Sequence, residues 1–265
     1  MGTWFTSNQK LTHKKLPLKT YLSELHVHTV LSPCAGVEMI PPLIVKKALD
    51  IGLNLIAITD HNASENVPAV IKAAEGSDLT VLPGMELQTE EDVHILCLFD
   101  TVEQLNKLQE LVDKTLPDIK NNVEFFGEQF IVDQTGEFIQ RKERLLINST
   151  QLSFDEAFHA VTELGGLFIP AHVNRQAFGL IDHLGFVPPD LDIDALEISR
   201  HISLEEAKTK FPQIKSFPLI QSGDVHYIDD FLGVIQFIIE KPTIAELKQA
   251  FMAINGRSFK VISHN

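Results

Sequence analysis

The stretch "LNLIAITDHNASENVPAVIKAAEGSDLTVLPG", residues 53–84, decides the predicted fold. Its beginning, "LNLIAIT" (53–59), and its end, "LTVLPG" (79–84), are both rich in β-forming apolar residues. Between them, "ENVPAVIKAAE" (65–75) has the apolar spacing of a helix. A strand, a helix and a second strand in this order indicate a parallel sheet.

The same alternation continues along the chain. We expect further strands at 93–99, 166–171, 193–199, 217–224 and 232–239, and helices near 101–115, 153–165 and 243–254. Ser153 and Glu156 have the spacing of a capping box at the start of the second of these helices. The first strand is not followed by a Gly-rich phosphate loop, which disfavours a dinucleotide-binding doubly wound sheet. An α/β barrel therefore fits better.

Residues 117–150 interrupt the alternation and contain "EQFIVDQTGEFIQ", in which two short β-rich runs flank a turn. We expect a small insertion that folds over one end of the barrel, or equally a surface elaboration that does not contact a substrate. The remaining organisation is simple: residues 1–20 read as a leader and residues 21–265 as one domain, with no internal repeat.

Composition limits the possible partners. The chain has 36 acidic and 22 basic residues and a formal net charge of −14, opposite in sign to the basic surface expected of a nucleic-acid groove. We therefore expect a small substrate or a nucleic-acid chain end, and no duplex nucleic acid. The longest apolar runs fall short of the roughly 20 residues of a membrane span, and the N-terminus does not resemble a signal peptide. Two cysteines suit a reducing cytoplasm. The oligomeric state cannot be read from the sequence.

Histidines and carboxylates gather beside the expected strands. "ELHVHT" (24–29) places His26 and His28 two residues apart, on one face of a strand together with Glu24. Other strand ends carry Asp60 and His61, Glu86, His172, and Asp224 and His226, while His94 lies near the start of its strand. In parallel barrels these ends meet at the functional face.

Each of these residues also has an ordinary interpretation. His94 could be a hydrogen-bonded, half-buried side chain, Glu86 a carboxylate at a helix terminus, and Asp60 a helix N-cap. Together, however, they would be costly to bury without partners. A mixed set of imidazoles and carboxylates therefore predicts a centre for Zn, Mn or Fe.

The ordered set "HVH" (26–28), "TDH" (59–61), "GME" (84–86), a lone His94, "AH" (171–172) and "DVH" (224–226) resembles the PHP (polymerase and histidinol phosphatase) family of metal-dependent phosphoesterases. The resemblance runs from residue 21 onward. It implies a distorted seven-stranded (β/α)7 TIM-like barrel and a site for two or three divalent metal ions. The implied ligands are His26, His28, His61, Glu86, His94, His172, Asp224 and His226. It also implies that Asp60 orients a ligand.

The chain departs from the family pattern after the first motif. The family commonly continues to S-D-G, whose Asp is a metal ligand, whereas this chain has Pro33 and Cys34 there. We expect Glu38 to replace that ligand, with the thiolate of Cys34 as the alternative for a softer metal. If neither residue is a ligand, the site would hold two metals.

An arginine follows the "AH" motif at the position where small phosphoesterases of the family often have A-H-P-x-R. Here the text is "AHVNR", so Arg175 is expected to bind the substrate phosphate through its planar fork of N–H groups. Its ordinary interpretation is a surface arginine paired with a carboxylate such as Asp182. Arg200 and His201 are weaker candidates for substrate contacts.

The implied function is hydrolysis of a small phosphomonoester or nucleotide phosphate by a metal-bridging hydroxide. A nucleotide or a short oligonucleotide end would be a suitable substrate. The chain has no G-x-S-x-G elbow, P-loop or C-x-x-C motif that would supply another mechanism. Two alternatives remain: a metal-dependent hydrolase of carbon–nitrogen bonds, and a PHP module that binds metal without catalysis.

Overall fold

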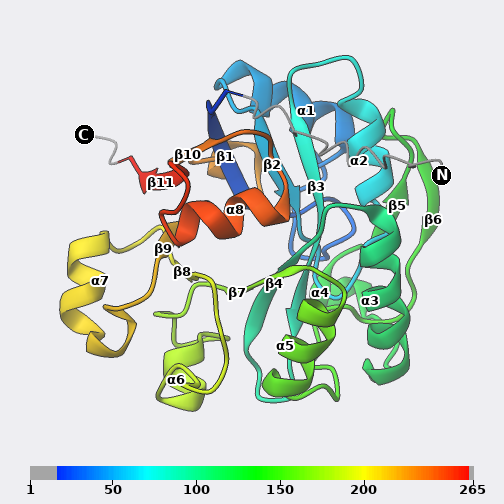
Figure 1. Cartoon of the computed structure of the whole chain (residues 1–265). Helices are drawn as coiled ribbons and strands as arrows, with labels where there is room; N and C mark the ends of the chain where they lie inside the picture. Colours follow the sequence, from blue (N-terminus) through cyan, green and yellow to red (C-terminus); the bar gives the residue numbers. More distant parts are fainter. Residues whose placement is uncertain (1–16, 263–265) are drawn as a thin grey trace, which may run out of the picture.

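One seven-stranded sheet forms the centre of the computed structural model, which describes residues 17–262 (Figure 1). Along the sheet the strands are β11 (Ser258–Val261), β10 (Ile235–Ile239), β1 (Lys19–Val27), β2 (Leu55–Ile58), β3 (Thr80–Gln88), β4 (His94–Leu98) and β7 (Leu167–Pro170). Two further pairs are β5 (Phe130–Val132) with β6 (Phe138–Arg141), and β8 (Leu196–Ile198) with β9 (Leu219–Gln221). Most of the predicted leader, together with His13 and His264, lies outside the described residues.

The helices lie mostly between strands, as predicted, although no helix separates β3 from β4 or β5 from β6. They are α1 (Pro41–Asp50), α2 (Val67–Ala73), α3 (Val102–Thr115), α4 (Val123–Phe126), α5 (Phe154–Glu163), α6 (Leu180–Leu184), α7 (Leu204–Lys210) and α8 (Ile244–Phe251), with 3-10 turns η1 (Pro212–Ile214) and η2 (Ile228–Asp230). The predicted capping box of Ser153 and Glu156 is present at the start of α5.

The pairing confirms a mixed α/β fold with a curled sheet, but not a regular parallel barrel. β1, β2 and β3 are parallel, whereas β4 is antiparallel to both β3 and β7. The pair β8–β9 stands apart from the large sheet. It is tied to the end of β1 by an isolated bridge between Val27 and Val225, and to the end of β7 by a hydrogen bond from Val173 N to Glu197 O.

Alternate residues of each strand build the inner face of the curled sheet. Leu82, Leu96 and Leu98 pack there with Leu247 and other apolar residues of α8, while the intervening side chains pack in the larger outer core. Gly84 continues the inner row of β3. A Cβ at Gly84 would lie 2.8 Å from both the carbonyl oxygen of Ile58 and Cδ2 of Leu98, so the close approach of the strands requires glycine there.

The insertion at 117–150 forms the predicted hairpin, and it also reaches the end of β2. Asn62 Nδ2 donates hydrogen bonds to the carbonyl oxygens of Leu146 and Asn148 at 2.8 and 2.9 Å. Asn66 Nδ2 similarly donates to the Phe130 carbonyl at 3.0 Å. The insertion is therefore attached directly to the loop that carries His61.

Two expectations from composition concern the environment of the protein. Among residues 17–262, none of the helices combines the length and the apolar character needed to cross a bilayer. Cys34 and Cys97 are both free, as the absence of a disulfide framework predicted. The cytoplasmic location stays a prediction.

Candidate metal centre

The strand directions bring the sequence-predicted residues to one edge of the sheet. Glu86 lies near the end of β3, in the inner row of Leu82 and Gly84. His94 opens β4 and pairs with Gln88, because β4 runs antiparallel to β3. The start of β4 therefore lies at the same edge as the ends of β1, β2 and β3, which explains why a histidine at a strand start joins the others.

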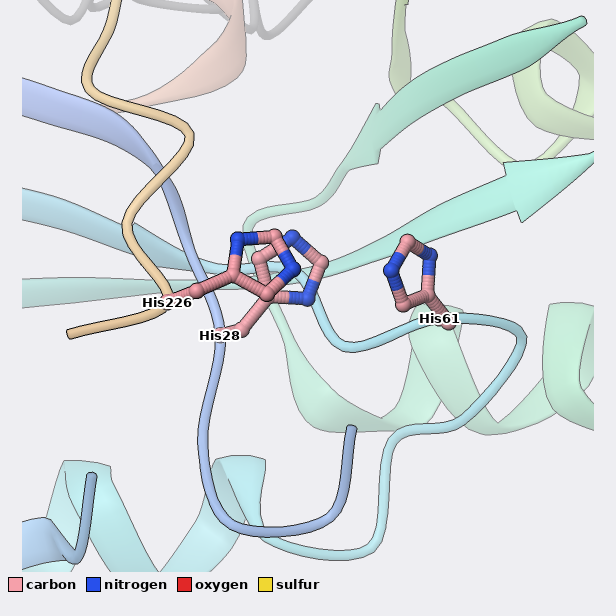
Figure 2. A group of neighbouring side chains, drawn as sticks. All are labelled: His28, His61 and His226. Carbon is pink, nitrogen blue, oxygen red and sulfur yellow. The ribbon is translucent and has the colours of Figure 1, made fainter. Parts of the chain in front are cut away.

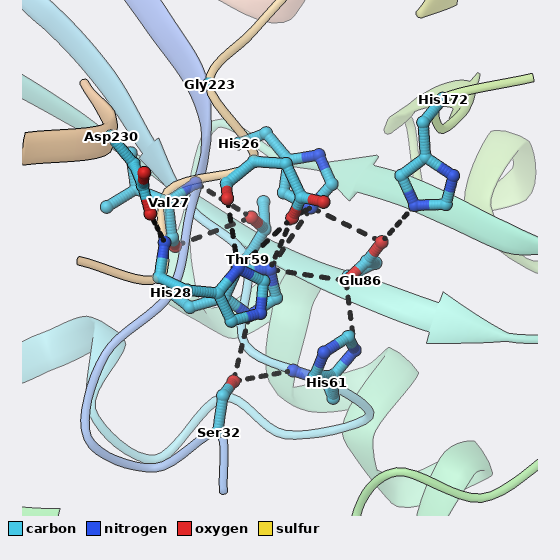
Figure 3. Close-up of polar contacts among 12 residues, drawn as sticks. His26, Val27, His28, Ser32, Thr59, His61, Glu86, His172, Gly223 and Asp230 are labelled. Atoms are coloured by element: carbon cyan, nitrogen blue, oxygen red, sulfur yellow. Dashed lines mark hydrogen bonds and ion pairs between the residues drawn. The ribbon is translucent and has the colours of Figure 1, made fainter. Parts of the chain in front are cut away.

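Glu86 is the hub of this cluster (Figure 3). Its carboxylate oxygens lie 3.3 Å from His26 Nε2, 3.3 Å from His28 Nε2, 2.9 Å from His61 Nδ1, 2.8 Å from His94 Nδ1 and 3.2 Å from His172 Nε2. Burial would raise the pKa of Glu86, but the neighbouring histidines hold it well below its usual range. The carboxylate is therefore charged, and its five nitrogen neighbours exceed the roughly four hydrogen bonds that a carboxylate can accept.

The hydrogen bonds around His28 determine which of its nitrogens faces the centre. The Ser32 hydroxyl donates its only proton to Asp60 Oδ1 at 2.7 Å, so it accepts from His28 Nδ1 at 2.9 Å. His28 Nε2 is then left with a free lone pair. The Nε2 atoms of His28 and His26 lie 3.1 Å apart, a contact that is favourable when a proton or a metal cation lies between the two nitrogens.

Glu197 has the corresponding role for His26. It accepts from His26 Nδ1 at 3.0 Å and from the backbone N–H of His172 at 3.0 Å. Burial opposes a charge on His26, yet Glu197, Glu86 and Asp224 raise its pKa well above the ordinary value. The surrounding carboxylates therefore favour positive charge at this point.

Within residues 17–262, several buried polar atoms at the centre make no well-aligned hydrogen bond, although some of them lie close to another member of the cluster. They are His61 Nδ1, Glu86 Oε2, His94 Nε2, His172 Nδ1 and Asp224 Oδ1. Such groups are costly to bury unless they coordinate a metal.

The side chains at this edge form three overlapping groups with metal-ligand spacing. The groups are His28, His61 and His226 (Figure 2); His26, His28, Glu86 and Asp224; and His61, Glu86 and His94. Within each group the candidate atoms lie within 4.8 Å of one another. These groups, together with the unpartnered atoms, could hold divalent cations.

Asp224 links the centre to the predicted phosphate arginine. Its Oδ1 lies 3.3 Å from His26 Nε2, and its Oδ2 accepts from Arg175 Nη1 at 2.6 Å. Arg175 is thus paired with Asp224 rather than Asp182. Its side chain is 40% exposed and borders a cavity of about 370 Å³ that also contains His61, His94 and Asp224.

Backbone strain also marks this region. His172 and Asp224 have φ values of 30° and 50°, in the left-handed region that residues other than glycine seldom adopt. Both residues follow the ends of strands, where this conformation turns their side chains toward the centre.

Two other predicted residues support loops around the site. Asp60 is buried and binds Thr29 and Ser32, so it faces the loop after β1 and not the cavity. Arg200 Nη1 donates to Asp230 Oδ1 at 2.9 Å and borders a neighbouring cavity of about 500 Å³, together with the exposed His201.

Glu38 is not brought to the centre, contrary to the sequence-based expectation. Its half-buried carboxylate lies against Gly36, and within residues 17–262 it belongs to none of the groups that could hold a metal. Cys34 also belongs to none of these groups, but unlike Glu38 it lines the cavity beside His61 and His226. Burial would raise the pKa of the Cys34 thiol, but the charge of His61 and hydrogen bonds with His226 and His61 lower it to about 6.

Sequence reasoning missed Glu197 and Phe178, and it placed Glu24 beside His26 and His28 without assigning it a role. Glu197 carried a signal, since it is a carboxylate in the otherwise apolar strand "ALEIS". Glu24 accepts from the N–H groups of Gly223 and Gly233 and so anchors the loop of Asp224; burial raises its pKa to about 7. Phe178 stacks on His94 with ring centroids 4.4 Å apart, and nothing in its sequence context indicates this.

Comparison with known proteins identifies the family. The family model described as PHP domain matches residues 24–182, more than half of the chain, so the protein belongs to the PHP domain family. DNA polymerase III PolC-type of Staphylococcus aureus is 29% identical over 219 residues. That match covers 70% of this chain and 15% of the polymerase, so the chain spans only a small part of the length of this relative.

Solved structures show the same fold. The lesion-specific endonuclease Q of Pyrococcus furiosus superposes with a TM-score of 0.66 and 21% identity, over 91% of this chain and 58% of the endonuclease. A protein of Bifidobacterium adolescentis assigned as a metal-dependent phosphoesterase matches with a TM-score of 0.51 and 19% identity, over 83% of this chain and 89% of that protein.

The predicted exclusion of duplex nucleic acid was wrong. Endonuclease Q in complex with a 27-mer duplex, with an abasic lesion at the active site, matches 91% of this chain and 58% of the endonuclease, with a TM-score of 0.63 and 20% identity. The exclusion rested on the net charge of −14, which is a sum over the whole surface. Such a sum does not describe the potential at one cavity.

Proposed function

We propose that the protein is a metal-dependent phosphoesterase whose active site is the cluster around Glu86. The observation that carries this proposal is the convergence of five imidazoles on one buried carboxylate, with unpartnered atoms on several of them. His26, His28, His61, Glu86, His94, His172, Asp224 and His226 would hold two or three ions of Zn, Mn or Fe.

The bound ions would lower the pKa of a water molecule and offset the charge of the phosphoryl oxygens. Arg175 would supply the remaining positive charge at the cavity mouth, where its N–H groups can exchange Asp224 for a phosphoryl oxygen. Ser32 and Glu197 would keep His28 and His26 oriented. Phe126 and Phe178 would limit the access of bulk water to the cavity.

A phosphodiester of nucleic acid is a substrate class that the comparisons favour beside a small phosphomonoester. The polymerase relative and endonuclease Q both support it, the latter in complex with a duplex. Two aromatic side chains also line the cavity, Phe126 from the insertion and Phe178 after β7. These rings suit stacking with a base.

The proposal is tested by a hydrolysis screen on protein loaded with Mn or Zn. We expect phosphate ester cleavage among a phosphomonoester, a phosphodiester, a single-stranded oligonucleotide and duplexes with and without an abasic site. His61→Ala should lower the rate by about 100-fold or more, because it removes a member of two ligand groups. His159→Ala, an exposed position on α5, is the matched control.

Three results would contradict the proposal. Equal activity of the His61→Ala and wild-type proteins, at unchanged metal content, would place the reaction elsewhere. Hydrolysis of amides without any phosphate ester cleavage would favour the carbon–nitrogen hydrolase, and bound metal without turnover of any substrate would favour the non-catalytic module.

A further inference from the structure

Cys34 lies in a turn that the backbone holds firmly against the candidate metal centre. Ala35 N donates to the Ser32 carbonyl at 2.9 Å, and Gly36 N donates to the His226 carbonyl at 2.8 Å. The turn is thereby tied both to the loop of His28 and to the loop of His226. Cys34 is exposed toward the cavity, which it lines together with His61 and His226.

The neighbouring histidine group differs chemically from the other two groups. His28, His61 and His226 offer three imidazole nitrogens and no carboxylate, whereas the other groups each contain Glu86. Figure 2 shows these three side chains extending from separate loops toward a common region. Three neutral ligands leave a tetrahedral divalent cation with one open position and its full charge.

The free nitrogen of two of these histidines can be assigned. His28 Nδ1 is bound by Ser32, and His226 Nδ1 donates to the carbonyl oxygen of Asp224 at 2.9 Å. Their Nε2 atoms are therefore available to a cation. His61 is 6% exposed, and its Nδ1 makes no well-aligned hydrogen bond within residues 17–262, although it lies 2.9 Å from Glu86 Oε2.

We propose that the Cys34 sulfur is the fourth ligand of a cation held by His28, His61 and His226. This inference rests on the metal centre of the proposed function. It assigns one of the sites a three-nitrogen, one-sulfur set, and such a set favours Zn over the harder Mn. Glu38, which lies against Gly36, takes no part in it.

Cobalt(II) substitution tests the inference by a signal that does not depend on activity. Cobalt-loaded wild-type protein should show a near-ultraviolet charge-transfer band from thiolate to cobalt. Cys34→Ser should lose this band, while Cys97→Ala should keep it, because Cys97 is fully buried in β4 with its sulfur near the Ile95 carbonyl. Cys34→Asp should lower the preference for Zn over Mn by about tenfold or more.

The outcomes separate this inference from the proposed function. If cobalt binds without the band, or the band persists in Cys34→Ser, the sulfur is not a ligand although the metal centre stands. If no metal binds, both proposals fail. If Cys34→Ser does not fold, the alkylation rate of the Cys34 thiol in the wild-type protein can be measured instead. Bound zinc should slow this alkylation at least tenfold relative to chelator-treated protein. An unchanged alkylation rate would overturn the inference.

Discussion

Ser32 and Glu197 show how residues outside the ligand set control the candidate centre. Each fixes the protonated nitrogen of one histidine, so that the opposite nitrogen of His28 or His26 faces the other ligands. The buried carboxylate of Asp60 sets the direction of the Ser32 hydroxyl. The geometry of the centre therefore depends on a hydrogen-bonded layer behind the histidines.

Replacing Glu197 by glutamine should weaken metal binding while leaving the fold intact. Glutamine keeps the size of the side chain but removes the charge that favours positive charge on His26. Outer partners of this kind typically change metal affinity by about 10- to 100-fold. Titration with Zn in competition with a chromophoric chelator measures the effect. The exposed Glu205→Gln is the control, and equal affinities of the two variants would contradict the role.

For individual residues, the sequence predicted which side chains beside strands reach the centre, but it did not predict which loop residues do. His26, Glu86 and His172 could be placed together because strand ends meet at one edge of a sheet. The expectation that Glu38 is the replacement ligand was not met, because the position of this segment depends on how the turn after His28 is tied to the His226 carbonyl. That tie joins residues about 190 positions apart along the chain, and no local pattern predicts it.

The expectation of a parallel sheet failed at β10, which runs antiparallel to β1 and β11, and at β4, which runs antiparallel to β3 and β7. Only residues 89–93 separate β3 from β4, which is too short for a crossover connection and produces an antiparallel pair. The apolar pattern of the strand was read correctly, but such a pattern does not contain the strand direction. The reversal is what places His94 beside Glu86.

The insertion is the element that should influence substrate preference. Phe126 of α4 and Ile147 line the cavity. Stacking of one base on an aromatic ring contributes about 1–3 kcal/mol to binding. Phe126→Ala should therefore raise the KM for a nucleotide or oligonucleotide about tenfold. The metal content should not change. Phe138→Ala, on the exposed side of the hairpin, is the control. Equal KM values for the two variants would show that the insertion does not contact the substrate.

For the whole molecule, sequence motifs and apolar spacing predicted the family and the α/β fold class. They did not predict how the curled sheet is closed, and the exclusion of duplex nucleic acid as a partner was wrong. Closure depends on single contacts such as the bridge between Val27 and Val225. The partner expectation failed because total charge was treated as a property of the site. The charges at the cavity are instead arranged in pairs, for example Arg175 with Asp224.

Arg257 connects the last segments of the chain, and this connection should make stability depend on pH. Its Nε and Nη2 donate to Glu246 of α8 at 3.0 and 2.9 Å, and Nη2 also contacts Glu240 at 2.6 Å. This pairing holds α8 against β10 and β11, where Leu247 and Phe251 complete the inner core. The hydrogen bonds from Arg257 hold the pKa of the Glu246 carboxyl below its usual range.

Because the pKa of Glu246 is lower in the folded protein, its carboxylate stabilises the fold above the unfolded-state pKa of about 4.3, and this contribution is lost as the pH falls through the folded value. Glu246→Gln should therefore lower the free energy of unfolding at pH 7, and the deficit should shrink toward pH 4 and below. Urea denaturation followed by circular dichroism at both pH values measures the deficit, with the exposed Glu110→Gln as control. A deficit that stays the same across this range would mean that the glutamate contributes through packing of α8 and not through its charge.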